Sequence, residues 1–285
     1  MRLNLAKSAG FCFGVRRALD IAAKTAQSNK NVVMLGDIVH NEQVVNKIRA
    51  SGIKKTGRLN AGKGKTLLIR AHGAPLAIFN KAKKLGYKII DATCPMVKEI
   101  HKIAGKMENK GYCVIVIGDK EHDEVRGIIG QLKNKSIVID KITGIPLSRI
   151  KKIRKACVVV QSTQNIDNTL AILAVLKKHI LRTVFFNTIC QPTRTKQEEI
   201  KSMPLQNDIM IIIGSRESAN TRRLYEISRS LNKRSWRVNS AKEIKPSWLI
   251  GVKTIGITAG ASTPQESIEE IISYLSNPPR SGNSR

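Results

Sequence analysis

Three of the five cysteines stand where a strand-like or turn segment meets a helix-like segment. They are Cys12 in AGFCFGV, Cys94 in DATCPMV and Cys190 in NTICQPT. Thiolates bind zinc and iron-sulfur clusters, and a fold can bring them together from distant parts of a chain. Cys113 and Cys157 lie inside apolar β-branched runs, which indicates small buried side chains. The candidate metal ligands are therefore Cys12, Cys94 and Cys190.

Polar side chains follow these cysteines at recurring distances. The positions 28 residues after them are His40, His122 and Ser218, each just past an apolar run. The positions 60, 68 and 72 residues after them are His72, Ser162 and Ser262, with Thr163 beside Ser162. Each of the three cysteines is thus followed by two such polar positions in the same order. This recurrence predicts an internal threefold repeat.

The repeat also predicts the elements that position these residues. Each unit reads as cysteine loop, helix, strand, polar tip, helix, strand, polar tip, which is typical of an α/β fold with parallel strands. We expect units at residues 1–93, 94–186 and 187–275, followed by a flexible tail at 276–285. Ligands of open parallel sheets bind beyond the carboxyl ends of the strands. Three units around a pseudo-threefold axis would bring the thiols and the polar tips to one central cavity.

The polar tips combine imidazoles, hydroxyls and an amide, which suit the oxygens of a diphosphate. The candidate binding residues are His40, His72, His122, Ser162, Thr163, Ser218, Asn220 and Ser262. Glu124 follows His122 by two residues. It is compatible with a first-turn carboxylate favoured by the helix dipole and with a proton donor. His101 and His179 are expected at solvated positions.

Three converging thiolates could bind zinc or an iron-sulfur cluster. Structural zinc has four ligands, normally in close CxxC pairs that this sequence lacks. A 4Fe-4S cluster held by three cysteines keeps one iron open, so that it could act as a Lewis acid toward a substrate oxygen. Three unrelated loop cysteines remain the simplest alternative.

Composition and charge exclude several classes of protein. The chain has 285 residues, 41% of them hydrophobic, and its 50 basic against 21 acidic residues give a net charge of +29. Such a charge attracts phosphate polymers, but aromatic residues make up only 4% of the chain and no nucleic-acid-binding motif occurs, so we expect no specific nucleic-acid binding. The longest apolar runs are strand-sized and the N-terminus lacks a signal-peptide core, which predicts a cytoplasmic protein without a membrane span. No dinucleotide or Walker motif indicates a nucleotide cofactor.

The motifs resemble one known family, the 4-hydroxy-3-methylbut-2-enyl diphosphate reductases. AGFCFGVRRAL, GDIVHN, RAHG, DATCP, IGDKEHDEV, GSRESANTRRL and TAGAS occur in the family's order. The resemblance implies that Cys12, Cys94 and Cys190 hold one 4Fe-4S cluster and that Glu124 supplies protons. It implies that the diphosphate is bound by His40, His72, His122, Ser218, Asn220 and Ser262. Ser162 stands where the family usually has a threonine near the substrate hydroxyl.

The resemblance also implies a reaction, the last step of the methylerythritol phosphate route to isoprenoids. The allylic diphosphate would lose its hydroxyl by reduction, giving isopentenyl and dimethylallyl diphosphates, with electrons from a ferredoxin or flavodoxin. A redox-sensing iron-sulfur protein and a nucleic-acid-binding protein are the rival classes.

The sequence departs from the family's pattern at several places, two of which concern the polar tips. Ala219 replaces a common serine, so that only its backbone N–H could contact the diphosphate. Asp123 replaces a frequent proline between His122 and Glu124, which adds flexibility and a charge beside the proposed acid.

Overall fold

The computed structural model describes residues 1–277, which form three four-stranded sheets. All nine strand pairings in these sheets are parallel, which confirms the predicted architecture of three parallel α/β units. The strand orders are β1-β12-β10-β11 in sheet A, β3-β2-β4-β5 in sheet B and β7-β6-β8-β9 in sheet C.

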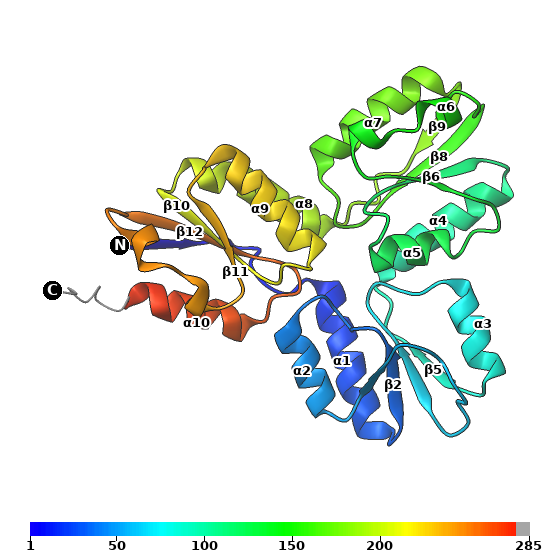
Figure 1. Ribbon diagram of the computed structural model, residues 1–285, viewed down its shortest axis with the longest axis horizontal. Helices are drawn as coiled ribbons and strands as arrows, with labels where there is room; N and C mark the ends of the chain where they lie inside the picture. Colours follow the sequence, from blue (N-terminus) through cyan, green and yellow to red (C-terminus); the bar gives the residue numbers. More distant parts are fainter. Residues whose placement is uncertain (278–285) are drawn as a thin grey trace. The chain divides into compact units, whose positions relative to one another are not determined.

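Strands and helices alternate along most of the chain (Figure 1). The strands are β1 (Arg2–Leu5), β2 (Val32–Leu35), β3 (Lys54–Thr56), β4 (Thr66–Ile69), β5 (Lys88–Asp91), β6 (Cys113–Ile117), β7 (Ile137–Ile139), β8 (Lys155–Val160), β9 (Arg182–Phe185), β10 (Ile209–Ile213), β11 (Ser235–Val238) and β12 (Thr254–Ala259). The α-helices are α1 (Phe13–Ser28), α2 (Glu42–Ala50), α3 (Leu76–Lys84), α4 (Pro95–Asn109), α5 (Asp123–Ile129), α6 (Leu147–Ile150), α7 (Ile166–His179), α8 (Gln191–Ser202), α9 (Ala219–Leu231) and α10 (Gln265–Ser276). Short 3₁₀ turns are η1 (Ile142–Gly144), η2 (Met203–Leu205), η3 (Ala241–Glu243) and η4 (Pro246–Leu249).

The central strands are continuous apolar runs because helices cover both faces of their sheets. In sheet C, Val114 and Val116 of β6 pack in one core with α4 and α5, whereas Ile115 and Ile117 pack in another with α7. Alternate side chains of a strand point to opposite faces, so a strand buried on both faces shows no polar alternation. Cys157 of β8 is fully buried in the α4 side of this core.

In sheet A too, alternate side chains of a central strand pack in different cores. Ile211 of β10 packs in one core with α10, and Ile212 packs in another with α8 and α9. One edge of this sheet is β1, which pairs in parallel with β12, about 250 residues further along the chain. The first strand is therefore part of the same sheet as the last three.

Contacts divide the chain into two compact units. The smaller unit contains Met1–Phe13, His40–Val44 and the chain from Gln191 onward, and thus sheet A. The larger unit contains Gly14–Val39 and Val45–Cys190, and thus sheets B and C. The three predicted ranges 1–93, 94–186 and 187–275 and the central cavity stay predictions. Most of the predicted tail, residues 278–285, lies outside the described residues.

The loops within the larger unit join sheets B and C. The Leu76 N–H donates to the Gly130 carbonyl at 3.0 Å, and the Gln131 side-chain amide donates to the Ala74 carbonyl at 2.9 Å. The loop after β4 is thereby fixed to the end of α5. Within residues 1–277, no helix is long and apolar enough to cross a membrane.

Candidate functional site

The polar tips of the larger unit follow the carboxyl ends of its strands. His72 follows β4, His122 follows β6 and Ser162 follows β8. Cys94 and Cys190 follow the edge strands β5 and β9. Parallel strands present their carboxyl ends at the same edge of a sheet, so these five residues lie at the ends where α/β proteins bind ligands.

The Glu124 carboxyl belongs to a buried residue close to these strand ends. Its side chain is 1% exposed, and it accepts hydrogen bonds from the Ser162 N–H at 2.6 Å and from the Ser162 hydroxyl at 2.8 Å. Burial raises the pKa of Glu124; the two bonds from Ser162 act in the opposite direction, and the charge of Asp119 adds to the increase. Because burial dominates, Glu124 is suited to carry a transferable proton.

Ser162 also links Glu124 to the third cysteine. Its carbonyl accepts a hydrogen bond from the Cys190 N–H at 3.1 Å, while its N–H and hydroxyl are bonded to Glu124. One residue therefore fixes the positions of a buried carboxyl and a cysteine-bearing segment. Thr163, its neighbour, accepts a hydrogen bond from the Gln161 side chain at 3.1 Å.

Two histidines of the larger unit, His72 and His122, lie against each other. The rings of His72 and His122 make an edge-to-face contact with centroids 5.3 Å apart. His122 caps helix α5, and its Nδ1 accepts the Glu124 N–H at 3.1 Å. A neutral imidazole that accepts at Nδ1 carries its proton on Nε2. In that tautomer the Nε2–H of His122 is a donor of the kind that binds an anion.

Each candidate cysteine directly precedes a helix of twelve or more residues. Cys12 precedes α1, Cys94 precedes α4 and Cys190 precedes α8. Their N–H groups donate to carbonyl groups at neighbouring strand ends, Cys12 to Ala261 at 3.2 Å and Cys94 to Ala71 at 2.9 Å. The positive end of a helix dipole stabilises a thiolate. All three thiols are partly exposed and thus accessible to a ligand.

The smaller unit brings together the remaining predicted tips. The Ser262 hydroxyl donates to the His40 carbonyl at 3.3 Å and lies 3.5 Å from the Ser218 hydroxyl. Ser218 caps helix α9 and accepts the Thr221 N–H at 3.3 Å. Ala219 and Asn220 are the first residues of that helix and are 4% exposed. The Asn220 amide nitrogen is buried and has no hydrogen-bond partner within residues 1–277, so a ligand oxygen would satisfy it.

Comparisons with known proteins show the family of this chain. The family model described as LytB protein matches residues 3–276. The chain belongs to this family. A 4-hydroxy-3-methylbut-2-enyl diphosphate reductase of Aquifex aeolicus is 38% identical over 95% of this chain and 94% of its own. One of Clostridioides difficile is 37% identical over 97% of this chain and 100% of its own.

Solved structures agree with this membership of the LytB family. A structure of (E)-4-hydroxy-3-methyl-but-2-enyl diphosphate reductase has a TM-score of 0.71 and 37% identity, covering 97% of this chain and 99% of that chain. The structure of the E-1-hydroxy-2-methyl-but-2-enyl-4-diphosphate reductase from Plasmodium falciparum has a TM-score of 0.89 and 29% identity, covering 98% of this chain and 89% of that chain. The resemblance inferred from the motifs is confirmed, and the chain is an enzyme of the oxidoreductase class.

The Asp123 carboxylate, where the LytB family frequently has proline, forms an ion pair. Arg70 Nη1 lies 2.5 Å from Asp123 Oδ2, and the two side chains are 18% and 19% exposed. Arg70 precedes His72 by two residues and Asp123 adjoins His122, so the pair connects the two histidine tips. The charge expected beside Glu124 is therefore paired with Arg70, and the carboxylate that raises the pKa of Glu124 is Asp119.

Sequence reasoning missed Arg70 and misplaced His101. His101 lies on α4 and packs against Gly73 and Gly127. A Cβ atom on Gly73 would lie 3.0 Å from its ring, and one on Gly127 would lie 3.4 Å from it. Burial lowers the pKa of His101 to about 4, so this imidazole is neutral at pH 7. The expectation of a solvated His101 was wrong because a helix-like pattern does not tell which face meets a glycine-rich loop. The glycines in RAHG and RGI were the available signal.

Glu124→Gln tests the burial of the carboxyl through stability. A raised pKa in the folded state means that the stabilisation is fully present below pH 4.5 and is lost as the pH rises through the folded pKa. Glutamine has the same size and can still accept the Ser162 N–H through its amide oxygen, while its amide nitrogen can donate to the Ser162 hydroxyl oxygen, but it cannot titrate. The difference in unfolding free energy, wild type minus Glu124→Gln, should therefore fall above pH 4.5, by about 1.4 kcal/mol for each tenfold change in proton affinity. Urea denaturation at a series of pH values measures it.

Glu198→Gln on the exposed face of α8 is the matched control for this series. Its difference from the wild type should vary much less with pH than that of Glu124→Gln. A pH-independent difference for Glu124→Gln would show that the carboxyl is not buried as described.

A double-mutant cycle tests the link between the histidine tips. Removing Arg70 and Asp123 singly and together, by alanine, should give a coupling energy of about 1 kcal/mol or more in urea denaturation. The exposed pair Arg126–Glu121, with side chains 53% and 77% exposed, is the control and should couple by less than about 0.5 kcal/mol. Equal coupling in the two pairs would contradict a special role for the Arg70–Asp123 pair.

Proposed function

We propose that this chain reduces (E)-4-hydroxy-3-methylbut-2-enyl diphosphate to isopentenyl and dimethylallyl diphosphates, as an iron-sulfur enzyme. Membership of the LytB family supports the substrate. The observation that carries the proposal is Ser162, which binds the buried Glu124 carboxyl and the segment of Cys190 at once. A proton donor and a metal ligand held by one residue suit a reaction that couples reduction to proton transfer.

One 4Fe-4S cluster held by Cys12, Cys94 and Cys190 is the cofactor of this proposal. The residues fit the group, because soft thiolates are the usual ligands of such clusters and each of these thiols stands at a helix N-terminus. The other two cysteines do not fit. Burial raises the pKa of Cys157 to about 12 and also raises the pKa of Cys113, so both remain thiols. When bound, the cluster supplies single electrons and an open iron for the substrate hydroxyl.

We assign the diphosphate to the polar tips that the sequence predicts. Its anionic oxygens would accept hydrogen bonds from imidazole, hydroxyl, amide and backbone donors. The proposed donors are His40, His72, His122, Ser218, Ala219 through its N–H, Asn220 and Ser262. Helix α9, thirteen residues long, begins at Ala219 and adds the positive end of its dipole. Unpaired Nδ2 of Asn220 supports this assignment directly, since it is buried and lacks a partner within residues 1–277.

Glu124 is the proposed proton donor, with Ser162 and Thr163 beside the substrate hydroxyl. Removal of that hydroxyl as water consumes two electrons and two protons, one for the water and one for the new C–H bond, and the carbon skeleton keeps its diphosphate. The Ser162 hydroxyl is already bonded to Glu124 Oε2 at 2.8 Å and is the natural relay between the carboxyl and the substrate. The protein contributes position, exclusion of water and a proton held at Glu124.

The proposed electron donor is a ferredoxin or flavodoxin, and the proposed compartment is the cytoplasm. Such donors are typically acidic, and the net charge of +29 favours their encounter with this chain. A specific nucleic-acid partner is not part of the proposal.

Cysteine variants test the proposed function. After anaerobic reconstitution, the wild type should hold about four irons per chain and turn over the hydroxylated diphosphate with an artificial reductant. Serine at Cys12, Cys94 or Cys190 should abolish turnover and greatly reduce the iron content, because an essential ligand is lost. Serine at Cys113 or Cys157 is the matched control and should preserve the iron content.

Near-normal turnover in any of the first three variants would remove that cysteine from the ligand set. A wild type that binds iron but neither reduces the diphosphate nor changes its spectrum when the diphosphate is added would be a redox-sensing protein.

A further inference from the structure

Lys196 is the one buried lysine among residues 1–277, with 2% of its surface exposed. It lies on helix α8, six residues after Cys190, and the mechanism above does not use it. A buried ammonium group is costly unless it is bonded to several acceptors. The acceptors of Lys196 therefore indicate what this charge is for.

One of these acceptors belongs to the segment that carries Cys12, and another belongs to β12. The Lys196 ammonium donates to the Ser8 carbonyl and, at 3.0 Å, to the Ala259 carbonyl at the end of β12. Ser8 belongs to residues 6–12, which connect β1 to helix α1 and which we call the Cys12 loop. Lys196 thus connects this loop to the last strand of sheet A.

Glu199 holds the same residue of the loop from one helical turn further on. Its Oε2 accepts the Ser8 N–H at 3.1 Å and also the Ser8 hydroxyl. Positions 196 and 199 share one face of α8, since residues three apart are neighbours on a helix. All three polar groups of Ser8 are therefore bonded to side chains of α8, the N–H and hydroxyl to an anion and the carbonyl to a cation.

The ends of the Cys12 loop are fixed by the backbone of the β12 region. The Ala6 N–H donates to the Ile257 carbonyl at 2.8 Å, and the Cys12 N–H donates to the Ala261 carbonyl at 3.2 Å. Between them the chain turns at Gly10, whose φ of +89° is a left-handed conformation that other residues rarely adopt. The middle of the loop is held by α8, through the bonds of Lys196 and Glu199 to Ser8.

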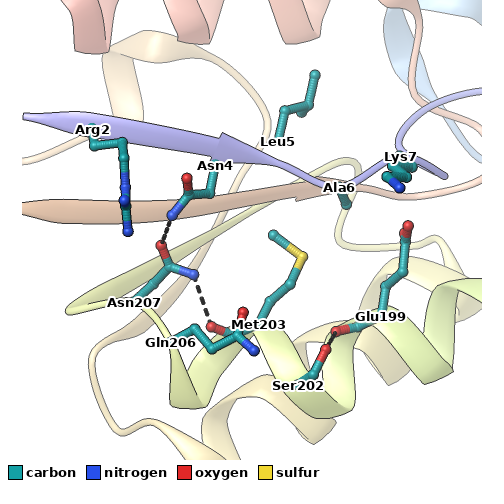
Figure 2. Close-up of a pocket in the computed structure, with 10 residues that line it drawn as sticks. All are labelled: Arg2, Asn4, Leu5, Ala6, Lys7, Glu199, Ser202, Met203, Gln206 and Asn207. Atoms are coloured by element: carbon teal, nitrogen blue, oxygen red, sulfur yellow. Dashed lines mark hydrogen bonds between the residues drawn. The ribbon is translucent and has the colours of Figure 1, made fainter.

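An open pocket lies beside Glu199 and the start of the Cys12 loop. This pocket of about 540 Å³ beside β1 is lined by Lys7, Glu199 and Asn207, among others. Figure 2 shows Glu199 extending from helix α8 toward the chain at Ala6 and Lys7. Water can compete for the partly exposed Glu199, whereas the ammonium group of Lys196 belongs to a buried residue.

We propose that Lys196 and Glu199 are positioning residues that hold the Cys12 loop in the conformation that presents Cys12 as a ligand. The inference rests on the proposed function in one respect, the assignment of Cys12 to the cluster. Both residues lie on the helix that begins directly after Cys190. The same helix thus starts at one proposed ligand and fixes the loop of another.

Hydrogen exchange of the full chain tests the positioning independently of activity. In Lys196→Met and in Glu199→Gln, the amides of residues 7–13 should exchange about tenfold faster, because their opening becomes easier. The amides of β10 should be unchanged. Lys201→Met and Glu198→Gln, both at exposed positions of α8, are the matched controls and should exchange as the wild type does.

Loss of iron to a chelator tests the consequence for the cluster. The reconstituted Lys196→Met and Glu199→Gln proteins should lose iron about tenfold faster than the wild type, and the two controls should not. Unchanged exchange at residues 7–13 in both variants would overturn the proposal, as would faster exchange throughout the chain or faster local exchange with unaltered iron loss. If the wild type binds no iron, the proposed function fails, while the exchange rates still decide whether α8 holds the loop.

Discussion

Two hydrogen bonds from Ser162 to the Glu124 carboxyl organise the site of the larger unit. They hold an ionisable group where only 1% of its residue surface is exposed, and they leave the Ser162 carbonyl to accept the Cys190 N–H. Burial raises the pKa of the carboxyl, as the proposed role of proton donor requires, while the two bonds keep it in one orientation. The position of the acid and the position of the cysteine segment consequently depend on the same residue.

The parallel sheets explain why such a residue exists at this place. A strand buried on both faces has polar surroundings only at its ends, and each strand here leads into a loop and commonly a helix. Helix N-termini therefore accumulate at the carboxyl ends of the strands, where their N–H groups and dipoles favour thiolates and phosphate oxygens. Cys12, Cys94 and Cys190 each directly precede such a helix.

The parts of the fold that could be predicted from the sequence are those with a local signal. The apolar runs of β6, β8 and β10 indicate buried parallel strands, and the recurring distance from cysteine to polar tip indicates repeated α/β units. The pairing of β1 with β12 has no such signal, because a four-residue strand is assigned to a sheet by tertiary contacts.

Some residues of the candidate site could also be identified from the sequence, and others could not. Strand-end residues such as His72 and Ser162 could be identified from their position in the sequence. The Arg70–Asp123 and Lys196–Ser8 contacts could not, because they join residues 53 and 188 positions apart. A charged residue in a basic chain indicates solvent exposure unless a specific partner is known. These partners come from other elements, so only the folded structure identifies them.

The kinetics of Glu124→Gln test the central claim most directly. Glutamine preserves the size of the side chain and the bond from the Ser162 N–H, and it can donate to the Ser162 hydroxyl oxygen, but it cannot give up a proton as the carboxyl does. The reconstituted variant should bind the hydroxylated diphosphate with wild-type affinity, while turnover falls about 100-fold or more, the usual scale of general-acid catalysis. Glu121→Gln, at an exposed position three residues before Glu124, should keep both affinity and turnover. A wild-type turnover rate in Glu124→Gln would show that the proton comes from another group and would contradict the account.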